Sequence, residues 1–207
     1  MEIPEHATLV LNGQFPANKT HLAFINDSSI IIAADGSLNH LIQNKIIPHF
    51  VIGDLDSADK GLIEKYNVQS IEIKDQSTTD FEKILIWCLE KKIQKISIFG
   101  IGGKDEDHHL SNLLTLNKFS QKILLEAFTD NYIITPISSY RKFKSFKNQT
   151  VSIMTFEKKS LVQSKNLFYE LNQTKITPSN FSIRNRSMGN QFEIETSNKV
   201  LIFQEIN

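Results

Sequence analysis

Two short apolar runs, each of which stops abruptly at acidic residues, constrain the fold of this chain most strongly. The first, residues 30–34 (IIIAA), leads into Asp35 and Gly36, and the second, residues 50–52 (FVI), leads into residues 53–57 (GDLDS). Uninterrupted apolar runs of this length are typical of strands that are buried on both faces. Between them the apolar residues recur at helical spacing, at Leu38, Leu41, Ile42 and Ile46, and Pro48 is expected to end that helix. A strand–helix–strand crossover of this length predicts two parallel strands.

The acidic residues that follow the two strands are expected to meet. Because the carboxyl ends of parallel strands lie at one edge of a sheet, Asp35, Asp54 and Asp56 should face one ligand site. Such carboxylates repel one another unless a cation lies between them, and magnesium prefers oxygen ligands and usually arrives with substrate phosphates. If the turn stays extended, Asp54 and Asp56 point to the same side, and Ser57 offers a hydroxyl to a phosphate oxygen. The alternative is that Asp, Gly and Ser only shape the turns.

Composition indicates a folded protein with two dissimilar halves. The 207 residues are 40% hydrophobic and 22% charged. No apolar run approaches the roughly 20 residues that cross a membrane, so a cytoplasmic protein without membrane contact is expected. Residues 1–130 hold 12 Lys and Arg against 18 Asp and Glu, whereas residues 131–207 hold 11 against 5. The basic residues of the second half are scattered rather than interleaved with aromatic residues, so nucleic acid is not an expected partner.

Hydrophobic periodicity predicts two domains that divide near residue 130. Residues 1–130 alternate buried strands with helices, which predicts a Rossmann-like α/β domain with a mostly parallel sheet. From about Lys122 the apolar runs become short and alternating, beginning with residues 122–128 (KILLEAF), and no long helix is evident. This pattern predicts a small C-terminal all-β domain over residues 131–207, which is an antiparallel sandwich or barrel.

A second polar stretch, residues 74–83 (KDQSTTDFEK), separates a predicted strand from a predicted helix. Helical spacing begins near Asp80, and Thr79 with Glu82 three residues later fits a capping box. A helix start favours a carboxylate through its dipole, so Asp80 has a structural explanation. However, Asp75, Gln76 and Asp80 also follow the carboxyl end of a strand, which places them at the same edge as the first cluster. A functional role is therefore the favoured interpretation.

The third informative stretch is a glycine-rich loop, residues 100–103 (GIGG), that lies between a strand and a helix. Backbone amides of such a loop can surround a phosphate, and Lys104 is placed to assist. His108 and His109 are adjacent and diverge on a helix, so a zinc site is not expected. Near the C-terminus, the polar residues 182–189 (SIRNRSMG) precede a strand and either close over a substrate or form an exposed hairpin connection.

Taken together, these motifs resemble the thiamine pyrophosphokinase family. The resemblance covers most of residues 7–118, and the β-rich remainder resembles the smaller domain of the family more loosely. It is carried by Ala34-Asp35-Gly36, by residues 53–57 (GDLDS), by Asp75-Gln76 with Thr79-Asp80-Phe81 and Lys83, and by the glycine loop leading to Asp107-His108. The resemblance implies an α/β domain followed by a β-sandwich for thiamine binding and dimerisation. The implied enzyme is a homodimer that transfers pyrophosphate from ATP to thiamine, with magnesium, giving thiamine diphosphate and AMP.

The resemblance also implies roles for individual residues. Asp54, Asp56 and Asp80 would hold magnesium and, with Gln76, form the catalytic group, with Asp80 or Asp75 accepting the hydroxyl proton. The remaining nucleotide-site residues are Asp35, Gly36, Ser57, Asp75, Thr79, Lys83, Lys104 and Asp107. Arg184 and Asn185 would bind thiamine. Two positions depart from the family pattern, because Asp105 stands where Arg is usual and Arg184 stands where Ser is usual. A different hydroxyl acceptor, and a nucleotide-binding regulator without turnover, therefore stay open as alternatives.

Overall fold

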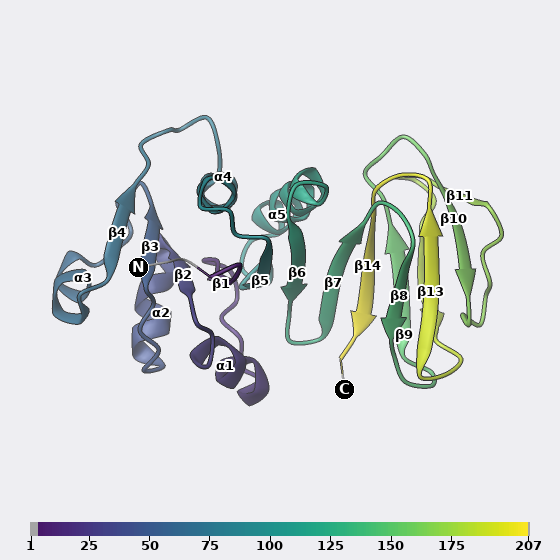
Figure 1. Ribbon diagram of the computed structural model, residues 1–207, viewed down its shortest axis with the longest axis horizontal. Coiled ribbons are helices and arrows are strands. Elements are labelled where there is room, and N and C mark those ends of the chain that lie inside the picture. The colour runs from purple at the N-terminus through teal and green to yellow at the C-terminus, as the bar shows by residue number, and fades with distance from the viewer. Residues whose placement is uncertain (1–3, 207) are drawn as a thin grey trace. The chain divides into compact units, whose positions relative to one another are not determined.

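The computed structural model describes residues 4–206; residues 1–3 and Asn207, at the ends of the two expected domains, lie outside the described range. Its chain forms two compact units (Figure 1). Unit 1 consists of residues 1–115 and 122–130, and unit 2 of residues 116–121 and 131–207.

Unit 1 contains a parallel sheet in the order β6-β5-β1-β2-β3-β4. Its strands are β1 (His6–Val10), β2 (Ile31–Ala34), β3 (Phe50–Gly53), β4 (Gln69–Glu72), β5 (Lys95–Phe99) and β6 (Leu124–Phe128). Its helices are α1 (Lys19–Asn26), the 3₁₀ turn η1 (Asp35–Ser37), α2 (Leu38–Gln43), α3 (Lys60–Tyr66), α4 (Asp80–Glu90) and the greater part of α5 (Glu106–Phe119). The expected parallel α/β architecture is confirmed.

Helices cover both faces of this sheet, which explains why its inner strands are apolar without alternation. On one face, Val10, Ile31 and Val51 pack in a single buried cluster, hereafter the unit 1 core cluster, with Ile25 of α1 and Leu41 of α2. On the other face, α4 packs against β3, and the ring centroids of Trp87 and Phe50 lie 5.1 Å apart. Burial on both sides makes the sheet a rigid base for the loops at its carboxyl edge.

The edge strand β4 is largely exposed, and its side chains limit pairing with another sheet. Glu72 in β4 forms a salt bridge of 3.5 Å with Lys74, and charged side chains on an edge strand disfavour association of sheet edges.

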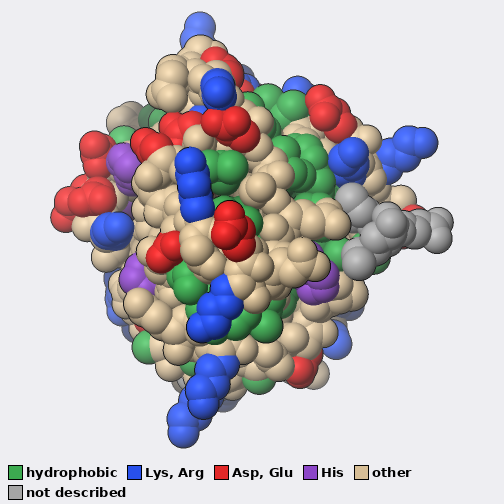
Figure 2. Space-filling model, turned by 90° about the vertical axis from the view of Figure 1, so that its left-hand side faces the viewer, with side chains coloured by type: hydrophobic (Ala, Val, Ile, Leu, Met, Phe, Trp, Pro, Cys, Tyr) green, Lys and Arg blue, Asp and Glu red, His purple; other side chains and the backbone are tan. Residues whose placement is uncertain are grey.

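Figure 2 shows acidic and basic side chains interspersed over the face that it presents, without a continuous basic surface.

Unit 2 contains two antiparallel sheets in the orders β12-β9-β14-β7 and β11-β10-β13-β8. Its strands are β7 (Tyr132–Ile137), β8 (Arg141–Lys144), β9 (Thr150–Met154), β10 (Ser160–Lys165), β11 (Thr174–Ile176), β12 (Ser182–Arg186), β13 (Gln191–Thr196) and β14 (Val200–Glu205). Residues from both sheets, among them Val151 and Phe192, share one buried cluster. Unit 2 is therefore a β-sandwich, which is one of the two architectures that the alternating pattern predicts.

Three elements differ from the sequence predictions. Residues 19–26 form helix α1, which their short apolar pattern did not reveal, and Asn18 caps it by accepting a hydrogen bond from the Thr20 amide. Helix α2 ends at Gln43, before Ile46 and Pro48 are reached. Strand β6, whose alternation resembles the antiparallel strands, instead pairs in parallel with β5. None of the helices within residues 4–206 combines the length and the hydropathy of a membrane span.

Gly100, which follows β5, provides a test of how tightly the loops at the carboxyl edge are packed. Its φ is +70°, and an added Cβ would lie 2.4 Å from the Leu11 carbonyl oxygen. We expect Gly100→Ala to lower the free energy of unfolding by about 2 kcal/mol or more, through steric overlap and left-handed strain.

Gly189→Ala is the matched control, because a Cβ there meets nothing within 4 Å. It should change stability by less than about 0.5 kcal/mol. Urea denaturation followed by circular dichroism measures both variants, and a Gly100→Ala protein as stable as Gly189→Ala would contradict the expected overlap.

Candidate active site

A cavity of about 420 Å³ lies at the carboxyl edge of the unit 1 sheet. Its walls come from the segments that follow β1, β2, β3, β4 and β5, as well as from the start of α4 and α5. This is the edge at which open α/β sheets bind ligands. The sequence-predicted residues that line it are Asp35, Asp54, Asp56, Ser57, Gln76, Thr79, Asp80, Lys83 and Lys104.

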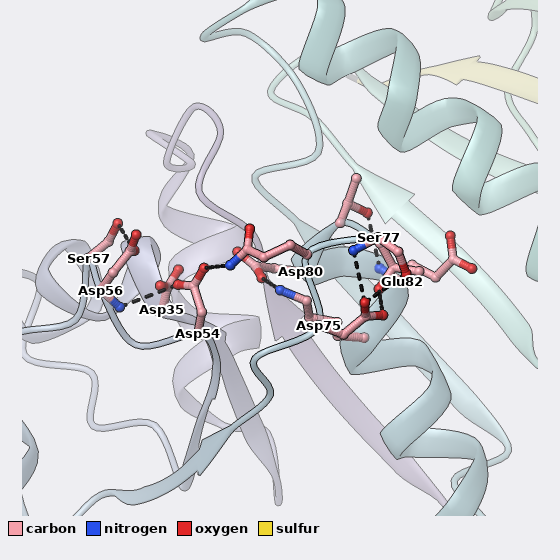
Figure 3. Close-up of polar contacts among 12 residues, drawn as sticks. Asp35, Asp54, Asp56, Ser57, Asp75, Ser77, Asp80 and Glu82 are labelled. Atoms are coloured by element: carbon pink, nitrogen blue, oxygen red, sulfur yellow. Dashed lines mark hydrogen bonds and ion pairs between the residues drawn. The ribbon is translucent and has the colours of Figure 1, made fainter.

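Three carboxylates converge in this cavity. One oxygen from each of Asp35, Asp54 and Asp56 lies within 4.8 Å of the others, and Figure 3 shows the three side chains gathered together. Asp35 is buried, Asp54 is partly buried and Asp56 is exposed. The gathering at one sheet edge that the sequence predicts is therefore present, and a set of carboxylate oxygens fits the coordination chemistry of magnesium.

Glycines make this convergence sterically possible. A Cβ at Gly53 would lie 3.0 Å from both Cβ and Cγ of Asp35, so a side chain there would push the two strands' acidic residues apart. A Cβ at Gly36 would lie 2.3 Å from the side-chain nitrogen of Asn12. Gly36 thus lies behind the cavity wall, where it gives room to Asn12, which does line the cavity.

The environment shifts the pKa values of two of these carboxyl groups in opposite directions. Burial, and then the neighbouring Asp80 and Asp54 charges, raise the pKa of Asp35, although hydrogen bonds from the Gly36 and Ser57 amides oppose that shift. Hydrogen bonds from the Asp56 amide and from Nε2 of Gln76 lower the pKa of Asp54. The site therefore favours negative charge on Asp54 and disfavours it on Asp35.

The turn that carries Asp54 and Asp56 is not extended, so the condition under which an extended backbone would point both side chains to one side is not met. Leu55 has a φ of 62°, in the left-handed region, and its side chain packs against the unit 1 core cluster. The Asp56 amide donates a hydrogen bond of 3.3 Å to Oδ1 of Asp54, and the Ser57 hydroxyl donates one of 3.0 Å to Oδ1 of Asp56. The Ser57 hydroxyl therefore already has a hydrogen-bond partner within the turn.

Asp80 enters the cavity together with a buried cation. Nζ of Lys83 lies 3.0 Å from Oδ1 of Asp80, and the Lys83 side chain is only 4% exposed. Thr79 caps α4 by accepting a hydrogen bond from the Glu82 amide, as the capping pattern predicts. Asp80 is not one of the three residues whose carboxylate oxygens converge, which are Asp35, Asp54 and Asp56. Its negative charge is instead compensated by Lys83.

Asp75 shapes its own loop and does not line the cavity. Its Oδ1 accepts hydrogen bonds from the amide and the hydroxyl of Ser77, and its Oδ2 accepts one from the Thr78 hydroxyl. These bonds also lower the pKa of the Asp75 carboxyl group. In Figure 3, Asp75 lies with Ser77, apart from Asp35, Asp54 and Asp56.

The glycine loop after β5 is held by the loop after β1. The Gly13 amide donates to the Gly100 carbonyl at 3.0 Å, and the Gln14 amide donates to the Gly102 carbonyl at 2.7 Å. Lys104 and Asp105 both line the cavity, whereas Asp107 does not and accepts a hydrogen bond from the His108 amide. The departure at Asp105 thus places an acidic residue in the cavity wall.

Several polar residues of the cavity wall were not predicted from the sequence, namely Asn12, Thr78, His109, Ser111 and Asn112. Asn112 donates from Nδ2 to the Ile101 carbonyl at 2.8 Å and so ties α5 to the glycine loop. The positions of Asn12 and Thr78 after the strands β1 and β4 could have indicated them. The places of His109, Ser111 and Asn112 depend on how α5 packs.

Arg184 and Asn185 lie in unit 2, on β12. Asn185 is buried: its Oδ1 accepts from the Tyr169 amide at 3.0 Å, and its Nδ2 donates to the Tyr169 carbonyl at 2.7 Å. Arg184 is exposed and has a φ of 55°, at an irregularity in the pairing of β12 with β9. Large apolar side chains are exposed on the adjoining segments, namely Phe168, Tyr169, Ile183 and Met188.

The fold and the cavity define an α/β protein with an acidic site at the carboxyl edge of its sheet, followed by a β-sandwich. Comparison with family models then identifies the two parts. Residues 22–125 match the catalytic domain of thiamin pyrophosphokinase, and residues 133–203 match its substrate-binding domain. This chain belongs to the thiamin pyrophosphokinase family.

Individual relatives agree with that assignment. Thiamin pyrophosphokinase 1 of Caenorhabditis elegans is 32% identical over 103 residues, which are 45% of this chain and 42% of that protein. Thiamine pyrophosphokinase of Bacillus subtilis is 36% identical over 102 residues, 46% of each chain. These alignments thus span less than half of either relative.

Solved structures share the fold over nearly the whole chain. A crystal structure of thiamine pyrophosphokinase from Bacillus subtilis superposes with a TM-score of 0.83 at 20% identity, covering 98% of this chain and 99% of the other. Thiamin pyrophosphokinase from Candida albicans also gives a TM-score of 0.83, at 17% identity, covering 98% and 90%. At these identities the likeness establishes the fold.

The raised pKa of Asp35 leads to a prediction about stability and pH. The pKa of Asp35 is higher in the folded protein than its ordinary value of 3.8. Its contribution to stability is therefore fully present below pH 3.8 and is lost as the pH rises through the raised pKa. In EDTA at neutral pH, Asp35→Asn should therefore raise the Tm by about 2 °C or more, because a buried ionised group is removed. The gain should shrink as the pH falls towards 3.8.

Asp27→Asn, which changes an exposed acidic residue at the end of α1, is the control and should leave the Tm unchanged. Thermal unfolding at several pH values measures both variants. A Tm for Asp35→Asn below that of the parent at neutral pH would show that Asp35 is stabilising when ionised, contrary to this account.

Proposed function

We propose that this protein transfers a pyrophosphate group from ATP to the hydroxyl of thiamine, forming thiamine diphosphate and AMP in the presence of magnesium. The observation that carries the proposal is the convergence of the Asp35, Asp54 and Asp56 carboxylates in a cavity at the sheet edge, in a chain of this family. We further propose that residues 1–130 bind the nucleotide, that residues 131–207 bind thiamine and form a homodimer, and that the enzyme is cytoplasmic.

The reaction requires charge neutralisation and alignment more than covalent chemistry. The thiamine hydroxyl oxygen forms a bond to the β-phosphorus of ATP, the bond from that phosphorus to the oxygen bridging to the α-phosphate breaks, and AMP leaves. Magnesium, when bound, would neutralise phosphate charge. Asp54 and Asp56 are its proposed ligands, and Asp80 stays a proposed third ligand. Asp35 is the buried carboxylate behind them, where its raised pKa disfavours ionisation unless a cation is near.

The proton of the thiamine hydroxyl needs an acceptor. Asp80 is the favoured one, because it lines the cavity, whereas both carboxylate oxygens of Asp75 are already engaged with Ser77 and Thr78. Gln76 is bonded to Asp54 through Nε2 and is proposed to orient the reacting groups around that carboxylate. Asp75 then acts by shaping the loop that presents Gln76 and Asp80.

The phosphate contacts are proposed to come from the rest of the cavity wall. Ser57 and Thr79 offer hydroxyl groups, and Lys104 offers an exposed ammonium group at the end of the glycine loop. Lys83 is buried against Asp80, so it balances charge at the base of the site. Gly36 and Asp107 lie outside the cavity wall and are proposed to act only by shaping the adjoining loops.

For the acceptor, Arg184 is proposed to act through its exposed side chain. Asn185 has both side-chain groups engaged with the Tyr169 main chain, so its proposed role is to hold the segment that carries Phe168 and Tyr169. These two exposed rings, in an edge-to-face pair with centroids 4.8 Å apart, offer a planar heterocycle an aromatic surface.

The test is AMP formation from ATP and magnesium, with and without thiamine. We expect AMP only when thiamine is present, in step with thiamine diphosphate. Asp54→Asn should lower turnover by roughly 100-fold or more, since charge stabilisation by a metal site is lost. The matched control is Asp59→Asn: Asp59 caps α3 outside the cavity wall, and Asn caps helices equally well.

Each contrary outcome points to a different conclusion. Bound ATP without thiamine-dependent AMP would move the function to another hydroxyl acceptor or to nucleotide sensing. Unchanged turnover and magnesium dependence in Asp54→Asn would remove Asp54 from the metal site while leaving the overall reaction intact.

A further inference from the structure

Leu55 adopts a backbone conformation that its side chain disfavours. Its φ of 62° lies in the left-handed region, where the Cβ of an L-residue crowds the following carbonyl oxygen. Among the eight described non-glycine residues with positive φ, Leu55 alone has an aliphatic side chain; the others are Asn, Lys, Gln or Arg. Strained residues of this kind persist only where the surrounding structure holds them.

Packing of the Leu55 side chain stabilises this left-handed conformation. The side chain is partly buried against the unit 1 core cluster, which includes Val51 of β3 and Ala58 directly after the acidic turn. Leu55 does not line the cavity. It therefore contacts the protein interior on one side of the turn while its neighbours Asp54 and Asp56 face the site on the other.

The left-handed residue determines where the two carboxylates point. In an extended chain, residues two apart are separated by roughly 7 Å. Here the turn instead allows the Asp56 amide to reach Oδ1 of Asp54 at 3.3 Å, and oxygens of both side chains lie within 4.8 Å of an Asp35 oxygen. A relaxed, extended Leu55 would separate the pair.

We propose that Leu55 is a positioning residue for the divalent cation: its apolar anchor holds the left-handed turn that brings the Asp54 and Asp56 carboxylates to Asp35. This inference rests on the proposed function, because it assigns a role to a residue behind the proposed metal site. The anchor is needed because leucine resists the conformation, whereas glycine adopts it without steric cost.

The test is Mn²⁺ binding to the 207-residue chain in the absence of nucleotide, measured from the electron paramagnetic resonance signal of free Mn²⁺. Leu55→Ala keeps the Cβ but loses the anchor, so its Mn²⁺ affinity should fall roughly tenfold, the equivalent of one strained left-handed residue. Leu55→Gly loses the anchor and the Cβ together and should stay within about threefold of the parent. Leu55→Met keeps an apolar anchor and should bind as the parent does.

Leu62→Ala is the matched control, because Leu62 packs against the same core cluster from α3 and does not line the cavity. It should lower the Tm as much as Leu55→Ala does without changing Mn²⁺ affinity. The role of Leu55 would be overturned if Leu55→Gly lost as much affinity as Leu55→Ala, or if Leu62→Ala also lost affinity.

The experiment distinguishes a failure of the proposed function from a failure of the positioning role of Leu55. A parent protein that binds no Mn²⁺ would overturn the metal site, and the positioning role with it. A parent that binds Mn²⁺ and forms AMP from ATP and thiamine, together with a Leu55→Ala variant of unchanged Mn²⁺ affinity, would overturn the positioning role alone.

Discussion

Repulsion among the carboxylates of Asp35, Asp54 and Asp56 is the constraint on which the arrangement of unit 1 depends. Three acidic groups with oxygens within 4.8 Å of one another are unfavourable without compensation, yet the fold brings them together. The pKa values of Asp35 and Asp54 are shifted in opposite directions. Burial disfavours ionisation of the Asp35 carboxyl group, and hydrogen bonds favour ionisation of the Asp54 carboxyl group. Lys83, buried beside Asp80, supplies positive charge at the base of the cavity. This balance of charge suits the cation and the polyanionic substrate that the proposed function requires.

The parallel sheet makes such a site possible, because its strands are held from both faces and cannot move apart to relieve the repulsion. Apolar packing beneath the acidic turn extends that rigidity to Leu55, and the hydrogen bonds between the loops after β1 and β5 extend it to the glycine loop. Enzymes that transfer phosphoryl groups stabilise the transition state mainly through charged groups that are already held in position. The stability of the core and the geometry of the site are thus linked by the same residues.

Several residues of the motifs do not line the cavity and instead support neighbouring segments. Asp75 binds Ser77 and Thr78, Gly36 gives room to Asn12, and Asn185 holds the main chain of Tyr169. A short polar side chain that hydrogen-bonds to nearby backbone stabilises a loop in one conformation. Neighbouring residues of that loop then lose less conformational entropy when a ligand binds. The same residue types therefore serve as ligands at one position and as supports at the next.

The sequence by itself determined the architecture and the edge at which the site forms. Uninterrupted apolar runs before Asp35 and before residues 53–57 require buried parallel strands, and parallel strands bring their carboxyl ends together. The change to short alternating runs likewise predicted an antiparallel sandwich or barrel for unit 2. Only the tertiary structure decided which of these residues face the cavity. The left-handed conformation of Leu55 depends on packing against the core. The engagement of Asn185 and the places of His109 and Asn112 depend on contacts with other segments of the chain. Periodicity reports which face of an element is buried, and it carries no information about those contacts.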